Sequence, residues 1–333
     1  MSKFAVMGAG SWGTTFAKVL ADGGNEVVLW ARRDDVVEDI NEHHRNGDYL
    51  PGIDLPEAMT ATLDPAEALA DAEQVYISVP SSTLRDNLQS WGHLIPKDAI
   101  LVSLMKGVEQ GSGLRMSQVI EDVLGWPKSQ VVVVSGPNLS AEIALEHPTA
   151  SVAACSKEEN AAAVARACTN EYFTTFTNRD VVGTEFGGIL KNLIAVAIGI
   201  VNGVGFGQNT KASIMTRGLA EISRFAVAYG AKQNTMMGLA GLGDLIATSE
   251  SPLSRNFKAG EMLGKGFSKR EVLRRLSQTA EGLNSVAPVL ELAAAKGVKM
   301  PIVEQVQLVI EGKMKPAEIA PHLMGEDEEP QGE

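Results

Sequence analysis

Short apolar runs alternate with amphipathic segments through the first half of the chain. Five runs end at Gly, Pro or a polar residue: 3–8, 26–31, 75–80, 100–105 and 131–136. Continuous runs of this kind are typical of parallel strands that are covered on both faces. Helical patterns lie between or after them, at 11–22, 34–46, 83–92, 113–124 and 158–169. The alternation predicts an α/β fold with a doubly wound parallel sheet, which runs 150–155 and 172–177 extend.

The pattern changes after about residue 180, where strand signals stop. Long helical patterns follow at 185–203, 210–230, 269–276, 285–296 and 303–311. We therefore predict a sheet domain over 1–182 and an all-helical domain over 183–325. Residues 326–333 read "EDEEPQGE", an acidic segment that predicts a disordered tail.

Composition narrows the possible partners and the compartment. The formal net charge of -12 disfavours nucleic acid as a partner, although a local basic pocket could still hold an anionic ligand. Two cysteines, Cys155 and Cys168, are too few for a disulfide framework. The first residues pass directly into a strand pattern without a signal peptide, so a cytoplasmic location is expected. The longest apolar run, "LIAVAIGIV", is too short to span a bilayer, so we expect no integral membrane segment.

A glycine-rich turn separates the first strand from the first helix. "VMGAGSWGTTFAKVL" places Gly8, Gly10 and Gly13 in G-x-G-x-x-G spacing, with Ser11 and Trp12 at the mouth of the turn. In this context the first glycine permits the tight turn, the second admits a pyrophosphate, and the third lets helix and strand pack closely. The motif predicts a dinucleotide site, with a ligand-free glycine turn as the alternative.

The end of the second strand bears on which dinucleotide binds. An NAD-binding unit usually has an acidic residue there, but this chain reads "LWARRDD", with Arg32 and Arg33 after the strand. Guanidinium groups suit the 2′-phosphate of NADP, so we expect NADPH to be preferred while NAD remains possible. Asp34 and Asp35 come later and could cap the next helix. Two solvated surface arginines are the alternative interpretation.

Isolated charges mark a second candidate site. Lys191 is the only charge between Glu185 and Lys211, and Asp244 is the only charge between Lys232 and Glu250. Charged residues are almost never fully buried without a partner, so these two could share a cleft. Either one alone could instead be half exposed or neutralised structurally.

Further polar residues follow two strands, beyond whose carboxyl ends ligands bind in doubly wound sheets. Lys106 follows the run 100–105, and Gly136 and Asn138 follow the run 131–136. In the helical half, "SPLSRNF" contains Ser254, Arg255 and Asn256. A hydroxyl, a guanidinium and an amide near a helix start predict a phosphate seat, with an ordinary polar loop as the alternative.

These motifs together resemble the family of bacterial NAD(P)-dependent glycerol-3-phosphate dehydrogenases. The resemblance covers nearly the whole chain, through "GAGSWGT", "SLMKG", "SGPN", "GGILKNLIAVAIGIVNGVGFG", "GLGDLIATSESPLSRN", "AEG" and "MPIVEQV". It implies an N-terminal Rossmann domain, a C-terminal helical domain and a homodimer. It also implies interconversion of dihydroxyacetone phosphate and sn-glycerol 3-phosphate, usually as a reduction that feeds phospholipid synthesis.

The resemblance also implies roles for individual residues. Lys191 matches the catalytic lysine, and Asp244 and Lys106 are expected to assist it. The substrate positions are Lys106, Gly136, Asn138, Lys191, Asp244, Ser254, Arg255 and Asn256. The cofactor positions are Gly8, Gly10, Ser11, Trp12, Gly13, Arg32, Arg33, Tyr49, Lys106, Ser140, Arg255 and Glu281; no metal site is expected. Three residues depart from the usual family pattern: Asn138, Ser140 and Gln208.

The resulting hypothesis makes Lys191 a general acid that protonates the substrate carbonyl oxygen during reduction. Burial should lower the pKa of this lysine, and a nearby carboxylate such as Asp244 should raise it. Two alternatives remain at this point. One is a related dehydrogenase for a 3-hydroxyacid or a ketoacid, and the other is a non-catalytic NADPH sensor.

Overall fold

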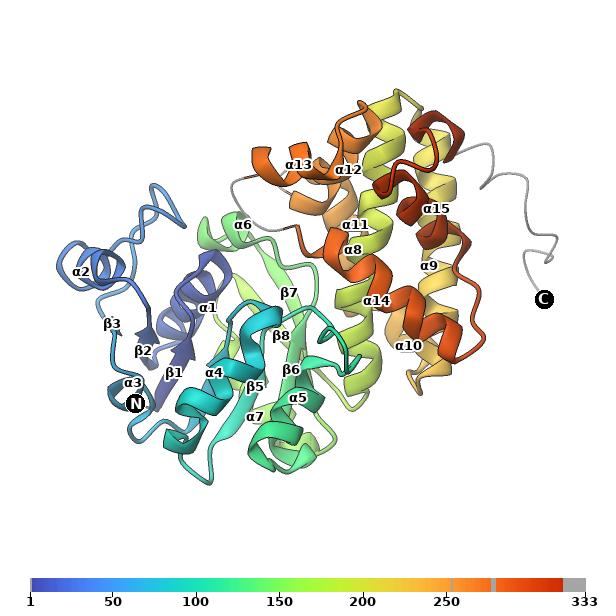
Figure 1. Cartoon of the computed structure of the whole chain (residues 1–333). Coiled ribbons are helices and arrows are strands. Elements are labelled where there is room, and N and C mark those ends of the chain that lie inside the picture. Colours follow the sequence, from blue (N-terminus) through green and yellow to red (C-terminus); the bar gives the residue numbers. More distant parts are fainter. Residues whose placement is uncertain (1, 253, 277–279, 320–333) are drawn as a thin grey trace.

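The computed structural model describes residues 2–252, 254–276 and 280–319. A single eight-stranded sheet fills one end of the molecule and a group of helices the other (Figure 1). The strands are β1 (Lys3–Met7), β2 (Glu26–Trp30), β3 (Met59–Thr62), β4 (Gln74–Ile77), β5 (Ile100–Ser103), β6 (Val131–Ser135), β7 (Thr149–Ala154) and β8 (Phe173–Asn178). Their order is β3-β2-β1-β4-β5-β6-β7-β8, in which the first six strands are parallel. This 3-2-1-4-5-6 order is that of the dinucleotide-binding doubly wound fold, so the predicted fold class is confirmed.

Helices cover both faces of the sheet because successive strand residues point to opposite sides. Phe4 and Val6 of β1 pack with one set of helices, whereas Ala5 and Met7 pack with another. The first set is α1 (Ser11–Asp22), α2 (Asp34–His43) and α7 (Glu158–Cys168). The second is α3 (Pro65–Leu69), α4 (Leu84–Trp91) and α5 (Met116–Leu124).

The last two strands reverse the direction of the sheet. β7 pairs antiparallel with β6, and β8 pairs parallel with β7. The segment between β6 and β7 holds one short helix, α6 (Ser140–Ala144). Five helical residues rise only about 8 Å, too little to carry the chain back along a strand and restart it in parallel. The sheet is therefore mixed at this edge, where the sequence pattern predicted parallel strands throughout.

The second half of the described chain is helical, as the pattern predicted. Its helices are α8 (Val181–Val204), α9 (Gln208–Ala228), α10 (Gln233–Met236), α11 (Asp244–Glu250), α12 (Arg255–Gly264), α13 (Lys269–Arg275), α14 (Glu281–Ala295) and α15 (Pro301–Ile310). A π-helical turn, Leu239–Gly243, leads into α11. Helix α8 is the axis of this half, and its neighbours α9, α11, α12, α14 and α15 pack around it.

Helix α8 is almost wholly buried, from Gly183 to Val201. Within the described chain it is the one helix long and apolar enough to cross a membrane, yet 83% of its most apolar stretch is buried inside the protein. A core helix passes the same test of length and composition, so we interpret α8 as the central helix of a globular domain.

Glycines bring α8 and α12 into backbone contact. Gly199 and Gly203 lie one turn apart on α8, and Gly260 and Gly264 lie one turn apart on α12. A Cβ built on Gly199 would lie 2.2 Å from the Phe257 carbonyl oxygen, and the other three would be equally close to the facing helix backbone. Small residues at this spacing let helix axes approach closely, which fixes α12 against the helix that carries Lys191.

Candidate active site

The glycine turn has the geometry expected of a pyrophosphate cradle. Gly8 has a φ of 127°, and a Cβ there would lie 2.4 Å from the Ser78 carbonyl oxygen. A Cβ on Gly13 would lie 1.9 Å from the Gly8 carbonyl oxygen, so helix and turn touch. At Gly10 a Cβ would meet nothing within 4 Å, which leaves open space in front of the turn. These three environments match the three glycine roles of a dinucleotide fingerprint.

The start of α1 is open to an anion. Among the described residues no side chain caps this helix, whose N-cap is Gly10, and its first turn holds no acidic residue. Free N–H groups at a helix N-terminus bind phosphate groups, so the turn fits a dinucleotide. The indole N–H of Trp12 donates to the Leu104 carbonyl oxygen at 3.1 Å, which anchors this side chain on the end of β5.

The loop after α2 is fastened beside the glycine turn. The Asn46 amide donates to the Ala9 carbonyl oxygen at 3.1 Å and to the Thr14 hydroxyl at 2.8 Å. Tyr49 follows on this loop and packs against the sheet core. Tyr49 therefore lies on the side of the molecule that holds the glycine turn, as its expected cofactor role requires.

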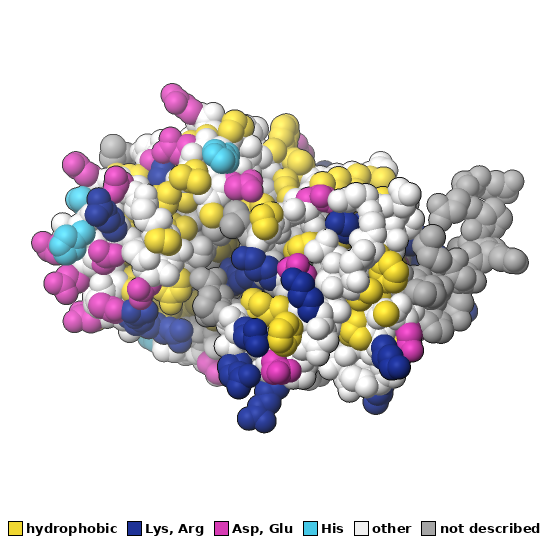
Figure 2. All heavy atoms as spheres, turned by 90° about the horizontal axis from the view of Figure 1, so that it is seen from above, with side chains coloured by type: hydrophobic (Ala, Val, Ile, Leu, Met, Phe, Trp, Pro, Cys, Tyr) yellow, Lys and Arg dark blue, Asp and Glu magenta, His cyan; other side chains and the backbone are white. Residues whose placement is uncertain are grey.

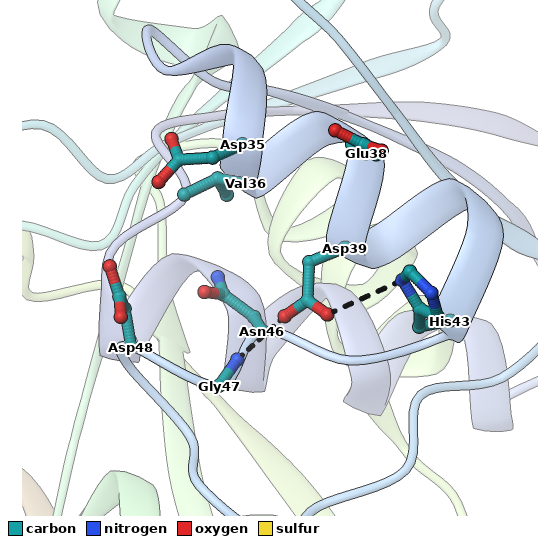
Figure 3. Close-up of a pocket in the computed structure, with 8 residues that line it drawn as sticks. All are labelled: Asp35, Val36, Glu38, Asp39, His43, Asn46, Gly47 and Asp48. Carbon is teal, nitrogen blue, oxygen red and sulfur yellow. Dashed lines mark hydrogen bonds and ion pairs between the residues drawn. The ribbon is translucent and has the colours of Figure 1, made fainter.

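The two arginines after β2 have different surroundings. Arg33 bonds to Asp35 and lies 2.7 Å from an Asp48 carboxylate oxygen, whereas Arg32 makes no ion pair with any described residue. Beside them is a hollow of about 340 Å³ between α2 and the following loop (Figure 3). Its lining includes four carboxylates, from Asp35, Glu38, Asp39 and Asp48, so it does not suit a phosphate and is not the substrate site.

The second site brings together three of the predicted charged residues. The Lys191 ammonium donates to one Asp244 carboxylate oxygen at 2.8 Å, and Lys106 donates to the other at 2.6 Å. Lys191 and Asp244 are 7% and 1% exposed. Two residues isolated in the sequence are thus partners across α8 and α11, and Lys106 joins them from the segment after β5.

The charge balance of this cluster acts on Lys191. Burial lowers the pKa of Lys191 to about 8, the Asp244 carboxylate opposes that shift, and the Lys106 charge adds to it. The sequence hypothesis named the first two causes. The effect of Lys106 follows from the shared carboxylate, which places two ammonium groups side by side.

Lys106 reaches the cluster because α8 leaves room for it. Its ammonium also donates to the Gly136 carbonyl oxygen at 3.2 Å, at the end of β6. A Cβ on Gly188 would lie 3.3 Å from the Lys106 Cδ and Cε atoms and 2.6 Å from the Ser135 hydroxyl. Gly188 is therefore the gap through which this lysine extends between sheet and helix.

Asn138 and Ser140 lie on the segment between β6 and β7. The Asn138 amide donates to the Ser151 hydroxyl at 3.0 Å. Ser140 is the first residue of α6, and its carbonyl oxygen accepts from the Thr15 hydroxyl of α1 at 3.4 Å. Ser140 thus lies against the helix that begins at the glycine turn, while Asn138 follows directly after the strand end near Lys106.

The "SRN" segment forms the start of α12. Ser254 is the N-cap, and its hydroxyl accepts from the Phe257 N–H at 3.2 Å. Arg255 and Asn256 are the first two helical residues. The Asn256 amide donates to the Asn192 side chain at 2.8 Å and its oxygen accepts from Gly282 N–H at 2.9 Å, so this side chain joins three helices.

Glu281 lies at the start of α14, near the basic residues of the site. Burial raises the pKa of its carboxyl, and the nearby charges of Arg255, Lys106 and Lys191 oppose that shift. The structure therefore brings Arg255 and Glu281 to the lysine cluster. Arg32, Arg33 and Tyr49 belong to the separate region around the end of β2.

Sequence reasoning missed two residues of the cluster. The Thr248 hydroxyl accepts from Lys191 and donates to Asp244 at 3.3 Å. The signal was the spacing of four residues between Asp244 and Thr248, which puts both on one face of a helix. Gly188 carried no comparable signal, because a glycine within an apolar run does not reveal what fills its space.

A pyrophosphate cradle on a 3-2-1-4-5-6 sheet, with a buried lysine–carboxylate cluster beyond the same strand ends, defines a dinucleotide-dependent dehydrogenase with a helical second domain. Residues 3–161 match the family model for the NAD-dependent glycerol-3-phosphate dehydrogenase N-terminus, and residues 180–321 match the model for its C-terminus. The chain belongs to this family.

Relatives agree over the full length. The chain is 59% identical to glycerol-3-phosphate dehydrogenase [NAD(P)+] of Leifsonia xyli over 98% of this chain and 89% of that one. It is 51% identical to the same-named protein of Thermobifida fusca over 99% of both chains.

Solved structures agree as well. The Coxiella burnetii glycerol-3-phosphate dehydrogenase structure has a TM-score of 0.91 at 34% identity, covering 98% of this chain and 99% of that chain. A Ralstonia eutropha ketopantoate reductase covers 97% of this chain and 99% of its own with a TM-score of 0.61, but at 17% identity it shares the fold alone.

Proposed function

We propose that the chain is an NAD(P)-dependent glycerol-3-phosphate dehydrogenase that interconverts dihydroxyacetone phosphate and sn-glycerol 3-phosphate. The observation that carries the proposal is the Lys191–Asp244–Lys106 cluster. Its Lys106 comes two residues after Leu104, whose carbonyl oxygen accepts from Trp12 at the mouth of the glycine turn. The names of the full-length relatives support the substrate. The division into a dinucleotide domain (1–182) and a catalytic domain (183–325) remains part of the proposal.

In this proposal Lys191 is the proton donor of the reduction. The glycine turn would hold a reduced nicotinamide dinucleotide, which would supply the hydride for C2 of the ketone. As negative charge develops on the carbonyl oxygen, the Lys191 ammonium stabilises it and gives up a proton, and in the reverse direction the neutral amine accepts one. Asp244 and Thr248 hold the ammonium in place, and Lys106 adds a second positive charge beside the oxygen.

The substrate phosphate is assigned to the start of α12. Arg255 provides a guanidinium beside Ser254, and free helix N–H groups add to the attraction. The Asn256 side chain is engaged by Asn192 and Gly282, so we assign it to orientation of the neighbouring helices rather than to direct grip on phosphate. Phosphate binding away from C2 positions the reacting atoms.

The cofactor is assigned to the glycine turn. Gly8, Gly10 and Gly13 shape the cradle, with Ser11 and Trp12 at its mouth. We assign Arg32, Arg33 and Tyr49, which follow β2, to the adenosine end that the turn would hold, and Ser140, Lys106 and Glu281 to the reacting end. We propose use of both cofactors with NADPH preferred, in a cytoplasmic homodimer that supplies phospholipid synthesis.

The function is tested by following NADPH and NADH oxidation side by side with dihydroxyacetone phosphate and with a panel of short ketoacids. Turnover of the phosphate ester is expected with both cofactors, and little turnover of the ketoacids. Lys191→Ala should lower kcat by about a hundredfold to ten-thousandfold, because a positioned general acid contributes that much. NADPH binding should stay nearly unchanged.

Three results would contradict this proposal. Preferred turnover of a ketoacid would favour the related dehydrogenase reading, in which a carboxylate replaces the phosphate. Tight NADPH binding with no turnover of any carbonyl substrate would favour a sensor. A near-normal kcat in the Lys191→Ala variant would remove that residue from the acid role.

A further inference from the structure

Arg33 is engaged by two carboxylates. Its Nε donates to one Asp35 oxygen at 3.0 Å, its Nη2 donates to the other Asp35 oxygen, and the same Nη2 lies 2.7 Å from Asp48. The Arg33 guanidinium holds the pKa of Asp35 below its usual range. The guanidinium fork that would receive a phosphate is therefore already occupied by two acids of the chain itself.

Arg32 differs from its neighbour. It is exposed at the same strand end but makes no ion pair with the described residues. One arginine of the pair is thus open to a ligand, while the other is shared between Asp35 on α2 and Asp48 on the following loop. A 2′-phosphate bound here would therefore meet one guanidinium without an ion pair, that of Arg32, and one that is already paired, that of Arg33.

The position of Asp48 is fixed by the fold. Asn46, two residues earlier, is bonded to Ala9 of the glycine turn and to Thr14 of α1. Figure 3 shows the Asp35 and Asp48 carboxylates on the same side of the acidic hollow, and Figure 2 shows acidic side chains gathered at the end of the molecule where α2 lies. The adenosine end of a bound dinucleotide would meet this acidic edge.

We propose that Asp35 and Asp48 set the cofactor selectivity of this chain by occupying Arg33, so that NADPH is favoured over NADH less strongly than two free arginines would allow. The proposal rests on the assignment of the dinucleotide to the glycine turn. A 2′-phosphate must compete with these carboxylates for the Arg33 guanidinium and is repelled by them. The uncharged 2′-hydroxyl of NADH neither competes with them nor is repelled.

The experiment measures binding by calorimetry on the full-length protein without substrate. The ligands are NADPH, NADH, adenosine 2′,5′-bisphosphate and 5′-AMP, and the variants are Asp35→Asn, Asp48→Asn and both together. Asp54→Asn is the matched control, because Asp54 lies on the same loop and pairs with a different arginine, Arg45, at 3.0 Å. Exposed ion pairs are each weak, so we expect each single variant to bind NADPH about twofold to fivefold more tightly.

Further expectations sharpen the test. The double variant should bind NADPH and the bisphosphate about fivefold to twentyfold more tightly, and the gain should shrink at high salt because these charges are exposed. Dissociation constants for NADH and 5′-AMP should change by less than about twofold. In an Arg33→Met background, Asp48→Asn should lose most of its effect.

The proposal is overturned if the Asp48→Asn gain does not exceed that of Asp54→Asn, or if it persists in full without Arg33. It is also overturned if NADH binding falls as NADPH binding rises, since Asp48 would then be a ribose ligand. These readouts need no turnover, so failure on dihydroxyacetone phosphate would contradict the proposed function alone. Absence of dinucleotide binding by the unaltered protein would contradict the dinucleotide assignment itself.

Discussion

Lys191 stands between opposing influences on one ammonium group. Burial and the Lys106 charge favour its neutral form, and the Asp244 carboxylate favours its charged form. The outcome, a pKa of about 8, leaves the lysine mostly protonated near neutral pH and able to release its proton. A solvent-exposed lysine would hold its proton too strongly for this purpose.

The pH dependence of the two directions should therefore be opposite. If Lys191 is the proton donor as proposed, the kcat for ketone reduction should fall as pH rises through about 8, because its ammonium loses its proton. The kcat for alcohol oxidation should rise over the same range, because the amine becomes a base. Stopped-flow or steady-state profiles from pH 6 to pH 10 in both directions provide the measurement.

The Asp244→Asn variant tests the effect of the Asp244 carboxylate on the pH dependence of kcat. Removal of the carboxylate removes the charge that raises the Lys191 pKa, so the alkaline limb of reduction should move to lower pH. A flat reduction profile across pH 7–10, or a shift of the limb to higher pH in this variant, would contradict the assigned charge balance.

The same pKa has a consequence for stability. Because the folded-state pKa of Lys191 lies below its ordinary value of 10.5, the folded chain binds fewer protons than the unfolded chain between about pH 8 and pH 10.5. The contribution of this group to the free energy of unfolding therefore rises with pH across that window. Burial of the ammonium is a cost to the fold at neutral pH.

At the residue scale, the sequence allowed prediction of the charged residues of the site but not of the uncharged residues that contact them. Lys191 and Asp244 could be found because a lone charge in an apolar run requires a partner. Thr248 was missed although it lies four residues after Asp244, a spacing that puts both on one helix face. Gly188 could not be singled out, because a missing side chain gains meaning only when the neighbour that fills its space is known. The sequence singled out Arg33, but its pairing with Asp48 depends on how the loop after α2 folds.

Among the elements, α8 carries the proposed proton donor and α12 begins with the proposed phosphate ligand. Lys191 lies on α8 and Arg255 begins α12, and the glycine contacts fix the distance and register between these helices. Slippage by one helical turn would move Arg255 about 5 Å relative to Lys191. These four glycines therefore help to position Arg255 relative to Lys191, although none of them is part of the site.

Gly199→Ala should lower the free energy of unfolding by about 1–3 kcal/mol or more, because overpacking forces the helices apart. The added Cβ would lie 2.2 Å from the Phe257 carbonyl oxygen. Urea denaturation is the measurement. Gly207→Ala is the control, since a Cβ at Gly207 meets nothing within 4 Å; equal losses in the two variants would argue against a tight α8–α12 contact.

Element type was predictable, but pairing was not. The strands from β1 to β8 other than β3 follow from apolar runs, whereas β3 reads "MTAT" and is too short and polar to stand out. Strand β7 was predicted, but its antiparallel direction was missed, because a local pattern does not encode the direction of the neighbouring strand. From the sequence, the glycines of α8 and α12 are only weak helix formers. Their role in close packing becomes visible when the two helices are seen in contact.

Viewed as a whole, the site lies where the sheet half and the helical half meet. Lys106 comes from the segment after β5, whereas Lys191 and Asp244 come from α8 and α11. A second buried contact joins the halves, since the Glu185 carboxylate at the start of α8 accepts from Arg115 and from the Ser117 N–H and hydroxyl at the start of α5. Both contacts resist separation of the two halves.

The central position of α8 also bears on how the chain is made. Its covering helices, α9, α11, α12, α14 and α15, all follow it in the sequence. During synthesis from the N-terminus, the sheet half can form first, but the apolar surface of α8 has no complete cover until α15 leaves the ribosome. Val303 and Val306 of α15 belong to the core around α8.

A chain that ends at Lys299 should therefore be mostly insoluble, and a chain that ends at Ile319 should remain soluble because it keeps every described helix. Soluble yield and dye binding to exposed apolar surface, compared in one expression system, measure the difference. Equal solubility of both chains would argue against a late-completed core. On this view, the helix that carries Lys191 keeps part of its apolar surface uncovered from its own synthesis until α15 is in place.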